Sequence, residues 1–146
     1  MDRTPIMRKI TLIIIHCSAN REGSKLKCKD IDRMHRQKGW DGCGYHFVIP
    51  TDGSIEKGRS LFKPGAHCKG HNRHSIGICY IGGLSKDGKQ TKDTRTMQQR
   101  QALDCLLQHL HRMFPNALIV GHHDLNPLKA CPCFDATTEY GYLQPQ

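Results

Sequence analysis

The sequence lacks a long hydrophobic run: its longest, Ile10–Ile15, has six residues and contains a threonine. A membrane-spanning helix needs roughly 20 apolar residues, and a secretory signal needs an apolar core followed by a small-residue cleavage site. The chain of 146 residues also has the length of about one domain. We therefore expect one soluble domain, made in the cytoplasm, with no export signal and no membrane insertion.

Acidic residues are scarce, with 13 Asp and Glu against 22 Lys and Arg, which gives a net charge of +9. Such a charge attracts polyanions, namely nucleic acids, anionic lipid surfaces or an anionic cell wall. A merely basic solvent-exposed face explains the charge equally well. Because no basic stretch is interleaved with aromatic residues, nucleic acid is the partner that we expect least.

No two cysteines have the C-x-x-C spacing of zinc ribbons and thioredoxin-like motifs, although the chain has eight of them. In the absence of an export signal we expect reduced thiols. Cys79 and Cys105 fall on apolar faces of a predicted strand and a predicted helix, and we expect both to be buried.

Hydrophobic periodicity predicts an α/β fold. Strands are predicted at 10–15, 44–49, 54–57, 75–81 and 117–120, and helices at 28–38, at 97–114 and, shorter, from Asp135. The turn residues 51–53 predict a hairpin, and Thr96 with Gln99 predicts a capping box. We expect a single domain, 1–146 with a core of about 10–135, in which helices flank a mixed central β-sheet.

Two of the predicted strands run into histidine, at His16 and at the pair His122-His123. Side chains converge at the ends of strands in α/β sheets, and Cys131 follows shortly after the second strand. Two imidazoles and a thiolate with an open fourth position are the arrangement of a catalytic zinc site. However, a chain with ten histidines and eight cysteines offers such triples by chance. Adjacent residues of a strand point to opposite faces, so we expect one histidine of the pair to bind, and the alternation does not say which.

Five motifs extend this interpretation over most of the chain. They are IIIHCSAN (13–20), GWDGCGYHFVI (39–49), DGSIEKGR (52–59), HNRHSIGICYIGG (71–83) and GHHDLNPLKACPCFD (121–135). In this order they resemble the zinc-dependent N-acetylmuramoyl-L-alanine amidases of the phage-lysozyme type, relatives of the animal peptidoglycan recognition proteins. The resemblance implies a Zn²⁺ ion bound by His16, His122 and Cys131. It further implies catalytic roles for Tyr45 and Lys129.

The implied reaction is hydrolysis of the amide between N-acetylmuramic acid and L-alanine in peptidoglycan or muropeptides. Zinc in such a site acidifies water toward a pKa of ~7, and Lys129 is placed to stabilise the oxyanion. A phenol with an ordinary pKa near 10 is a poor base at neutral pH, so Tyr45 is expected to orient the water or the carbonyl, or simply to pack. The loop between His122 and Cys131 is slightly longer than in a phage amidase of this type, and the extra length is expected to bulge outward and to affect the placement of Lys129.

His67, His71 and His74 form a loose cluster before the strand predicted at 75–81. These histidines fit three interpretations: ligands of a second metal ion, surface residues or substrate contacts. The resemblance favours His67 as a substrate-binding residue beside the groove. Cys133 is expected to pack, because a second ligand so close to Cys131 would have poor geometry around one metal.

Two further functions compete with an amidase. A peptidoglycan-binding module without catalysis is one, but binding-only relatives commonly lack the cysteine that is present here as Cys131. A polymerase regulator of the phage type is the other, and it would show salt-sensitive DNA binding. As an amidase, the chain is expected to be a monomer that reaches the cell wall through a lysis pore, as a phage or prophage lysin, or that recycles muropeptides in the cytoplasm.

Overall fold

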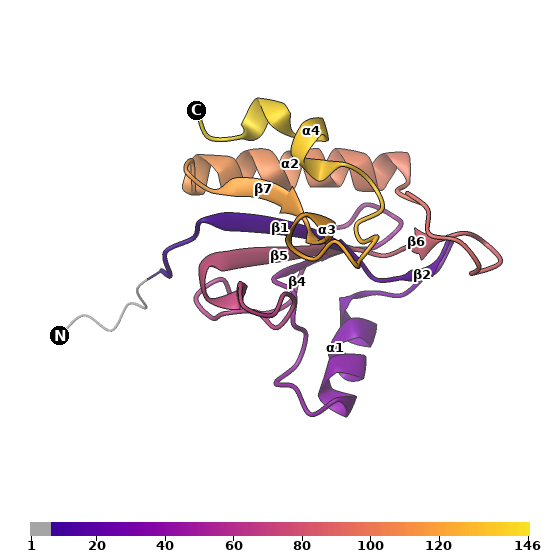
Figure 1. Ribbon diagram of the computed structural model, residues 1–146. Coiled ribbons are helices and arrows are strands. Elements are labelled where there is room, and N and C mark those ends of the chain that lie inside the picture. The colour runs from indigo at the N-terminus through magenta and orange to yellow at the C-terminus, as the bar shows by residue number, and fades with distance from the viewer. Residues whose placement is uncertain (1–6) are drawn as a thin grey trace.

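The computed structural model describes residues 7–146, in which helices lie on both sides of one central sheet (Figure 1). The sheet has five strands in the order β4-β3-β5-β1-β7. Their bounds are Leu12–Cys17 (β1), Phe47–Ile49 (β3), Glu56–Lys57 (β4), Ser75–Tyr80 (β5) and Leu118–Gly121 (β7). β4 is antiparallel to β3 and the other pairings are parallel. The predicted single α/β domain with a mixed sheet is therefore confirmed.

β1 lies between β5 and β7 and is apolar on both faces. Ile13, Ile14 and Ile15 are each 0% exposed, as expected for a central strand of a parallel sheet that is covered from both sides. The strand starts later than predicted and continues to Cys17, so His16 lies inside it and not beyond its end. A buried, fully paired strand gives the His16 backbone a rigid support.

The two long helices cover opposite faces of the sheet (Figure 1). α2 (Met97–Met113) buries a leucine stripe, and α1 (Cys28–Gln37) packs Ile31 near Val48 of β3. The predicted capping box at the start of α2 is confirmed: the Thr96 hydroxyl accepts from the Gln99 N–H at 3.0 Å, and the Gln99 side chain accepts from the Thr96 N–H at 2.9 Å. None of the helices in residues 7–146 is long and apolar enough to cross a membrane.

Short elements complete the fold. They are β2 (Asn20–Arg21) and β6 (Gly83–Leu84), which pair in parallel, the helical turns α3 (His122–Leu125) and α4 (Ala136–Glu139), and the 3₁₀ turns η1 (Asn72–His74) and η2 (Gly141–Leu143). The predicted hairpin is present as the β3–β4 pair.

The prediction that Cys105 is buried is wrong. Cys105 is exposed, because the face of α2 that packs on the sheet is formed by Leu103, Leu106, Leu107 and Leu110. Cys79 on β5 is buried as expected. All eight cysteines are free thiols.

Candidate active site

The ends of β1 and β7 bring His16, His122 and Cys131 together. The ligand atoms of these three side chains lie within 4.8 Å of one another. The sheet register explains part of this arrangement, because Ile15 of β1 is paired with Gly121 of β7. His16 directly follows the first of these residues and His122 directly follows the second. The two imidazole rings are 4.6 Å apart, and His16 is only 2% exposed.

His122 is placed by a helix and not by a strand. β7 ends at Gly121 and α3 begins at His122, so the expected alternation of His122 and His123 along a strand is wrong. The Asp124 carboxylate fixes this change of direction by accepting from the Gly121 N–H at 2.8 Å. The His123 N–H donates to the carbonyl of Cys131 at 2.8 Å, which ties the loop that carries the cysteine back to α3.

The sulfur of Cys131 is held from the side of β1. The backbone N–H of Cys17 donates to Cys131 Sγ at 3.0 Å. The next residue is held as well, because the Tyr80 hydroxyl donates to the carbonyl of Pro132 at 2.6 Å. Cys133 packs against the core, with its sulfur 3.9 Å from that of Cys17. The loop that carries Cys131 is therefore anchored to both β1 and β5.

A buried cation secures the far end of the same loop. The Arg95 guanidinium, whose side chain is 0% exposed, pairs with Asp93 at 2.9 Å and with Glu139 at 2.7 Å. It also lies over the ring of Phe134. A buried cation needs such partners, and here they fix the segment that follows Cys131.

Both histidines of the cluster are electrostatically tuned to stay neutral. Burial lowers the pKa of His16 well below its usual value, and the neighbouring His67 and His122 lower it further. Burial, followed by the nearby ammonium of Lys129, lowers the pKa of His122. A neutral imidazole has a free lone pair for a metal, and two of them with a cysteine sulfur form a donor set that suits zinc.

Tyr45 and Lys129 flank this cluster. The Tyr45 ring lies 5.1 Å from the His16 ring, and burial raises the pKa of its hydroxyl well above the usual value. With its proton in place, the Tyr45 hydroxyl can donate a hydrogen bond. Lys129 is exposed, and its backbone N–H donates to the carbonyl of Asn126 within the loop that leads to Cys131.

The histidine cluster of the sequence divides into two groups. His67 Nδ1 lies 2.8 Å from His16 Nε2, so His67 belongs to the site. His71 and His74 contact each other instead, with ring nitrogens 3.4 Å apart.

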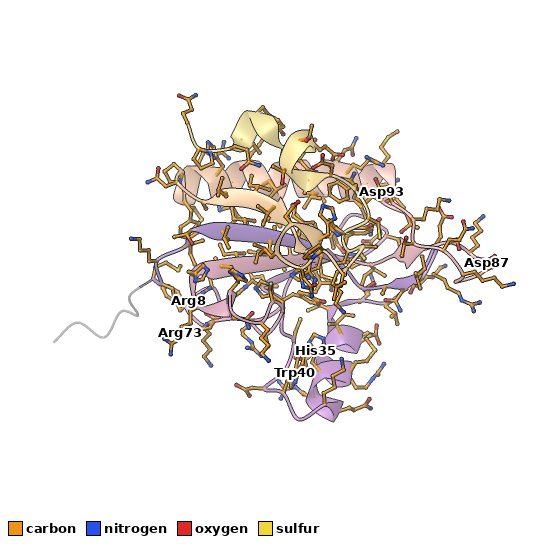
Figure 2. All side chains as sticks on the ribbon, in the orientation of Figure 1. Arg8, His35, Trp40, Arg73, Asp87 and Asp93 are labelled. Carbon is orange, nitrogen blue, oxygen red and sulfur yellow. The ribbon has the colours of Figure 1, made fainter. Side chains whose placement is uncertain are left out.

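A pocket of about 500 Å³ opens beside Tyr45 and His67. His35, Trp40, Lys38 and Lys69 contribute to its lining. Figure 2 shows Trp40 close to His35 of α1, and their rings are 4.6 Å apart. Lys38 Nζ lies 5.2 Å from the centroid of the Trp40 ring. Both charged side chains of this lining are cationic, which suits an anionic ligand next to the cluster of His16, His122 and Cys131.

Comparison with known proteins agrees with this geometry. Residues 6–134 match the N-acetylmuramoyl-L-alanine amidase family. The chain belongs to this family. The endolysin of Enterobacteria phage K11 is 40% identical to it over 121 residues, which cover 83% of this chain and 79% of that protein. The resemblance stated from the sequence motifs is thus confirmed.

Solved structures of an amidase and of peptidoglycan recognition proteins share the fold. The N-acetylmuramoyl-L-alanine amidase LysC from Clostridium intestinale URNW superposes with a TM-score of 0.77 at 27% identity, covering 95% of this chain and 88% of that one. The ectodomain complex of peptidoglycan recognition proteins LCa and LCx bound to tracheal cytotoxin gives a TM-score of 0.71 at 30% identity, covering 86% of this chain and 76% of that one.

Several residues around the site were not singled out from the sequence. Trp40 lies in the same motif as Tyr45, and its being the only tryptophan in the sequence was the available signal. The N–H of Cys17 and the side chain of Arg95 carry no local pattern, because their roles depend on contacts with the distant segment 131–134.

Proposed function

We propose that this chain is a zinc-dependent N-acetylmuramoyl-L-alanine amidase that acts on the peptidoglycan of the cell wall. The observation that carries the proposal is the convergence of His16, His122 and Cys131, with ligand atoms within 4.8 Å of one another, in a chain of the amidase family. Its phage endolysin relative supports a role as a lysin. The bond cleaved is the amide between N-acetylmuramic acid and L-alanine.

The three side chains would hold the zinc ion, which supplies Lewis acidity and activates water for attack on an amide carbonyl. The hydrogen bond from the Cys17 N–H to Cys131 Sγ holds the sulfur beside the two histidines. The low pKa of His16 keeps its imidazole available as a ligand.

Lys129 and Tyr45 have separate proposed roles. Attack on the carbonyl carbon places negative charge on the carbonyl oxygen, and the Lys129 ammonium stabilises that charge in the transition state. The Tyr45 hydroxyl, whose ring lies 5.1 Å from that of His16, donates a hydrogen bond that orients the carbonyl or the attacking water. As the C–N bond breaks, the leaving amine takes up a proton that comes from the water.

A peptidoglycan-binding module without catalysis is the second candidate. The pocket lined by Trp40, Lys38 and Lys69 favours it, because such a pocket binds an anionic ligand whether or not cleavage follows. A relative of known structure is bound to tracheal cytotoxin.

The two candidates differ in the product. Purified peptidoglycan treated with the zinc-loaded protein should gain free L-alanine amino groups without new reducing sugar ends, and a chelator should abolish the gain. Binding to peptidoglycan with no new amino groups at any zinc concentration would contradict the amidase and support the binding module.

A further inference from the structure

The His67 ring lies between the proposed metal ligand His16 and the buried hydroxyl of Ser75. His67 Nδ1 is 2.8 Å from His16 Nε2, and His67 Nε2 is 3.2 Å from Ser75 Oγ. The rings of His16 and His67 meet edge to face, with centroids 4.9 Å apart. Both ring nitrogens of His67 therefore have a partner within the protein.

The structure holds His67 in this position from two sides. The Asn72 side-chain oxygen accepts from the backbone N–H of His67 at 2.9 Å and from that of Cys68 at 3.0 Å. On β5, Gly77 leaves space for the ring, because a Cβ there would lie only 2.6 Å from His67 Cγ. A substrate contact on a surface loop would need neither feature.

The hydrogen-bond chain has a direction. A neutral imidazole carries one N–H and one lone pair, so the two ring nitrogens of each histidine have opposite roles. If His16 donates from Nε2 to His67 Nδ1, its own Nδ1 keeps a lone pair, and His67 donates from Nε2 to Ser75. Among residues 7–146 no hydrogen bond reaches His16 Nδ1, which leaves this nitrogen for a metal.

We infer that His67 is a positioning residue for the metal ligand His16, with Ser75 as the end of the chain, and not primarily a substrate contact. The inference rests on the proposed zinc site. The partner of a ligating histidine fixes its tautomer and ring orientation, and its loss typically weakens metal binding by about 10–100-fold.

Zinc affinity of the purified chain, measured by competition with a chromophoric chelator, tests this role. His67→Ala should weaken zinc binding by about 10–100-fold, and His67→Gln, whose amide oxygen can accept from His16, should recover part of it. Ser75→Ala should weaken binding less. His74→Ala, in the same segment but outside the hydrogen-bond chain, is the matched control and should bind zinc like the wild type.

A second readout is independent of affinity. Nitrogen-15 NMR of the zinc-loaded chain should show His16 protonated at Nε2, and the absorption spectrum of the Co²⁺-substituted chain should change in His67→Ala. If His67→Ala does not fold, His67→Gln and Ser75→Ala provide the same comparison.

The outcomes separate this role from the proposed function. A wild-type chain that takes up no zinc would overturn the metal site and this role together. A wild type that binds zinc, with variants of equal affinity and unchanged spectra, would overturn only the role of His67. If the His67 variants keep their zinc affinity but have a raised KM, His67 contacts the substrate and does not position His16.

Discussion

The guanidinium carbon of Arg95 lies 3.4 Å from the centroid of the Phe134 ring. The arginine precedes α2, and the phenylalanine follows the Cys131 loop closely. The contact is completed by the carboxylates of Asp93 and Glu139, so one buried cation joins the start of α2 to the segment after the proposed metal ligand. The position of Cys131 therefore depends on residues far outside the site.

Replacing this cation should destabilise the fold. Arg95→Ala should lower the free energy of unfolding by ~3–5 kcal/mol, because it leaves two carboxylates without their buried partner. Arg100, which lies 3.0 Å from Asp93, moderates the loss. Urea denaturation measures the change, and Arg33→Ala, at an exposed pair with Asp30, should have little effect. Equal midpoints for the two variants would contradict a structural role for Arg95.

Loss of the proposed thiolate ligand should remove the metal. Cys131→Ser should retain the fold but lose zinc on dialysis against metal-free buffer at neutral pH, because a serine hydroxyl does not ionise to a comparable ligand. Cys105→Ser, at an exposed cysteine on α2, is the matched control and should keep zinc. Metal analysis of both proteins gives the answer, and a full complement of zinc in Cys131→Ser would refute the ligand assignment.

The two groups that flank the site should affect rate more than binding. Lys129→Ala should lower kcat by ~10²–10³ while zinc content and substrate affinity stay near wild type. The reason is that the negative charge stabilised by the Lys129 ammonium exists only in the transition state. Tyr45→Phe should behave similarly if its hydroxyl acts in the reaction, and should change little if its ring only packs. Lys89→Ala, on an exposed turn, serves as the control. A loss that arises wholly in KM would instead place both residues in substrate binding.

The stability of the metal-free chain should fall as the solution becomes mildly acidic. Burial lowers the pKa of His46 to about 4 and that of His67 to about 3. The unfolded chain, with histidine pKa values near 6.5, therefore takes up protons first, and stability present above about pH 6.5 is lost as the pH falls toward 4. Urea midpoints at about pH 7.5 and about pH 5 should show the drop, and His46→Gln should reduce it. Identical midpoints in the wild type would contradict these shifts.

The cationic pocket should attract anionic substrate. The double variant Lys38→Gln and Lys69→Gln should raise KM for a soluble muropeptide at low ionic strength and leave kcat unchanged. Added salt should shrink the difference from wild type, because screening weakens the attraction that the variant lacks. Lys89→Gln is the charge-matched control. A KM difference that does not depend on salt would point to a packing role for the two lysines.

The elements with a strong local pattern were predictable. The apolar run of β1, and the leucine stripe and capping box of α2, are patterns within short stretches of sequence. The α/β fold could therefore be predicted from them. α3 was not predicted, because a four-residue turn has no periodicity and depends on individual contacts, such as that of the Gly121 N–H with the Asp124 carboxylate.

The site was predictable in part for the same reason. Strand ends and the motif resemblance singled out His16, His122 and Cys131, which the fold brings together. The contact between His16 and His67 depends on tertiary packing, which joins the segment before β5 to β1. No local sequence pattern encodes that pairing, so His67 was grouped with its sequence neighbours.

Among the strands of residues 7–146, β1 is synthesised first, yet both of its sheet partners come much later, since Leu12 pairs with Ser75 and with Leu118. Pairings of such large sequence separation slow folding, because the chain must close long loops before it gains contacts. The segment with Cys131 is synthesised after all five strands of the central sheet. An incomplete chain that ends before it would lack one of the three proposed ligands, so activity should appear only after this segment has been synthesised.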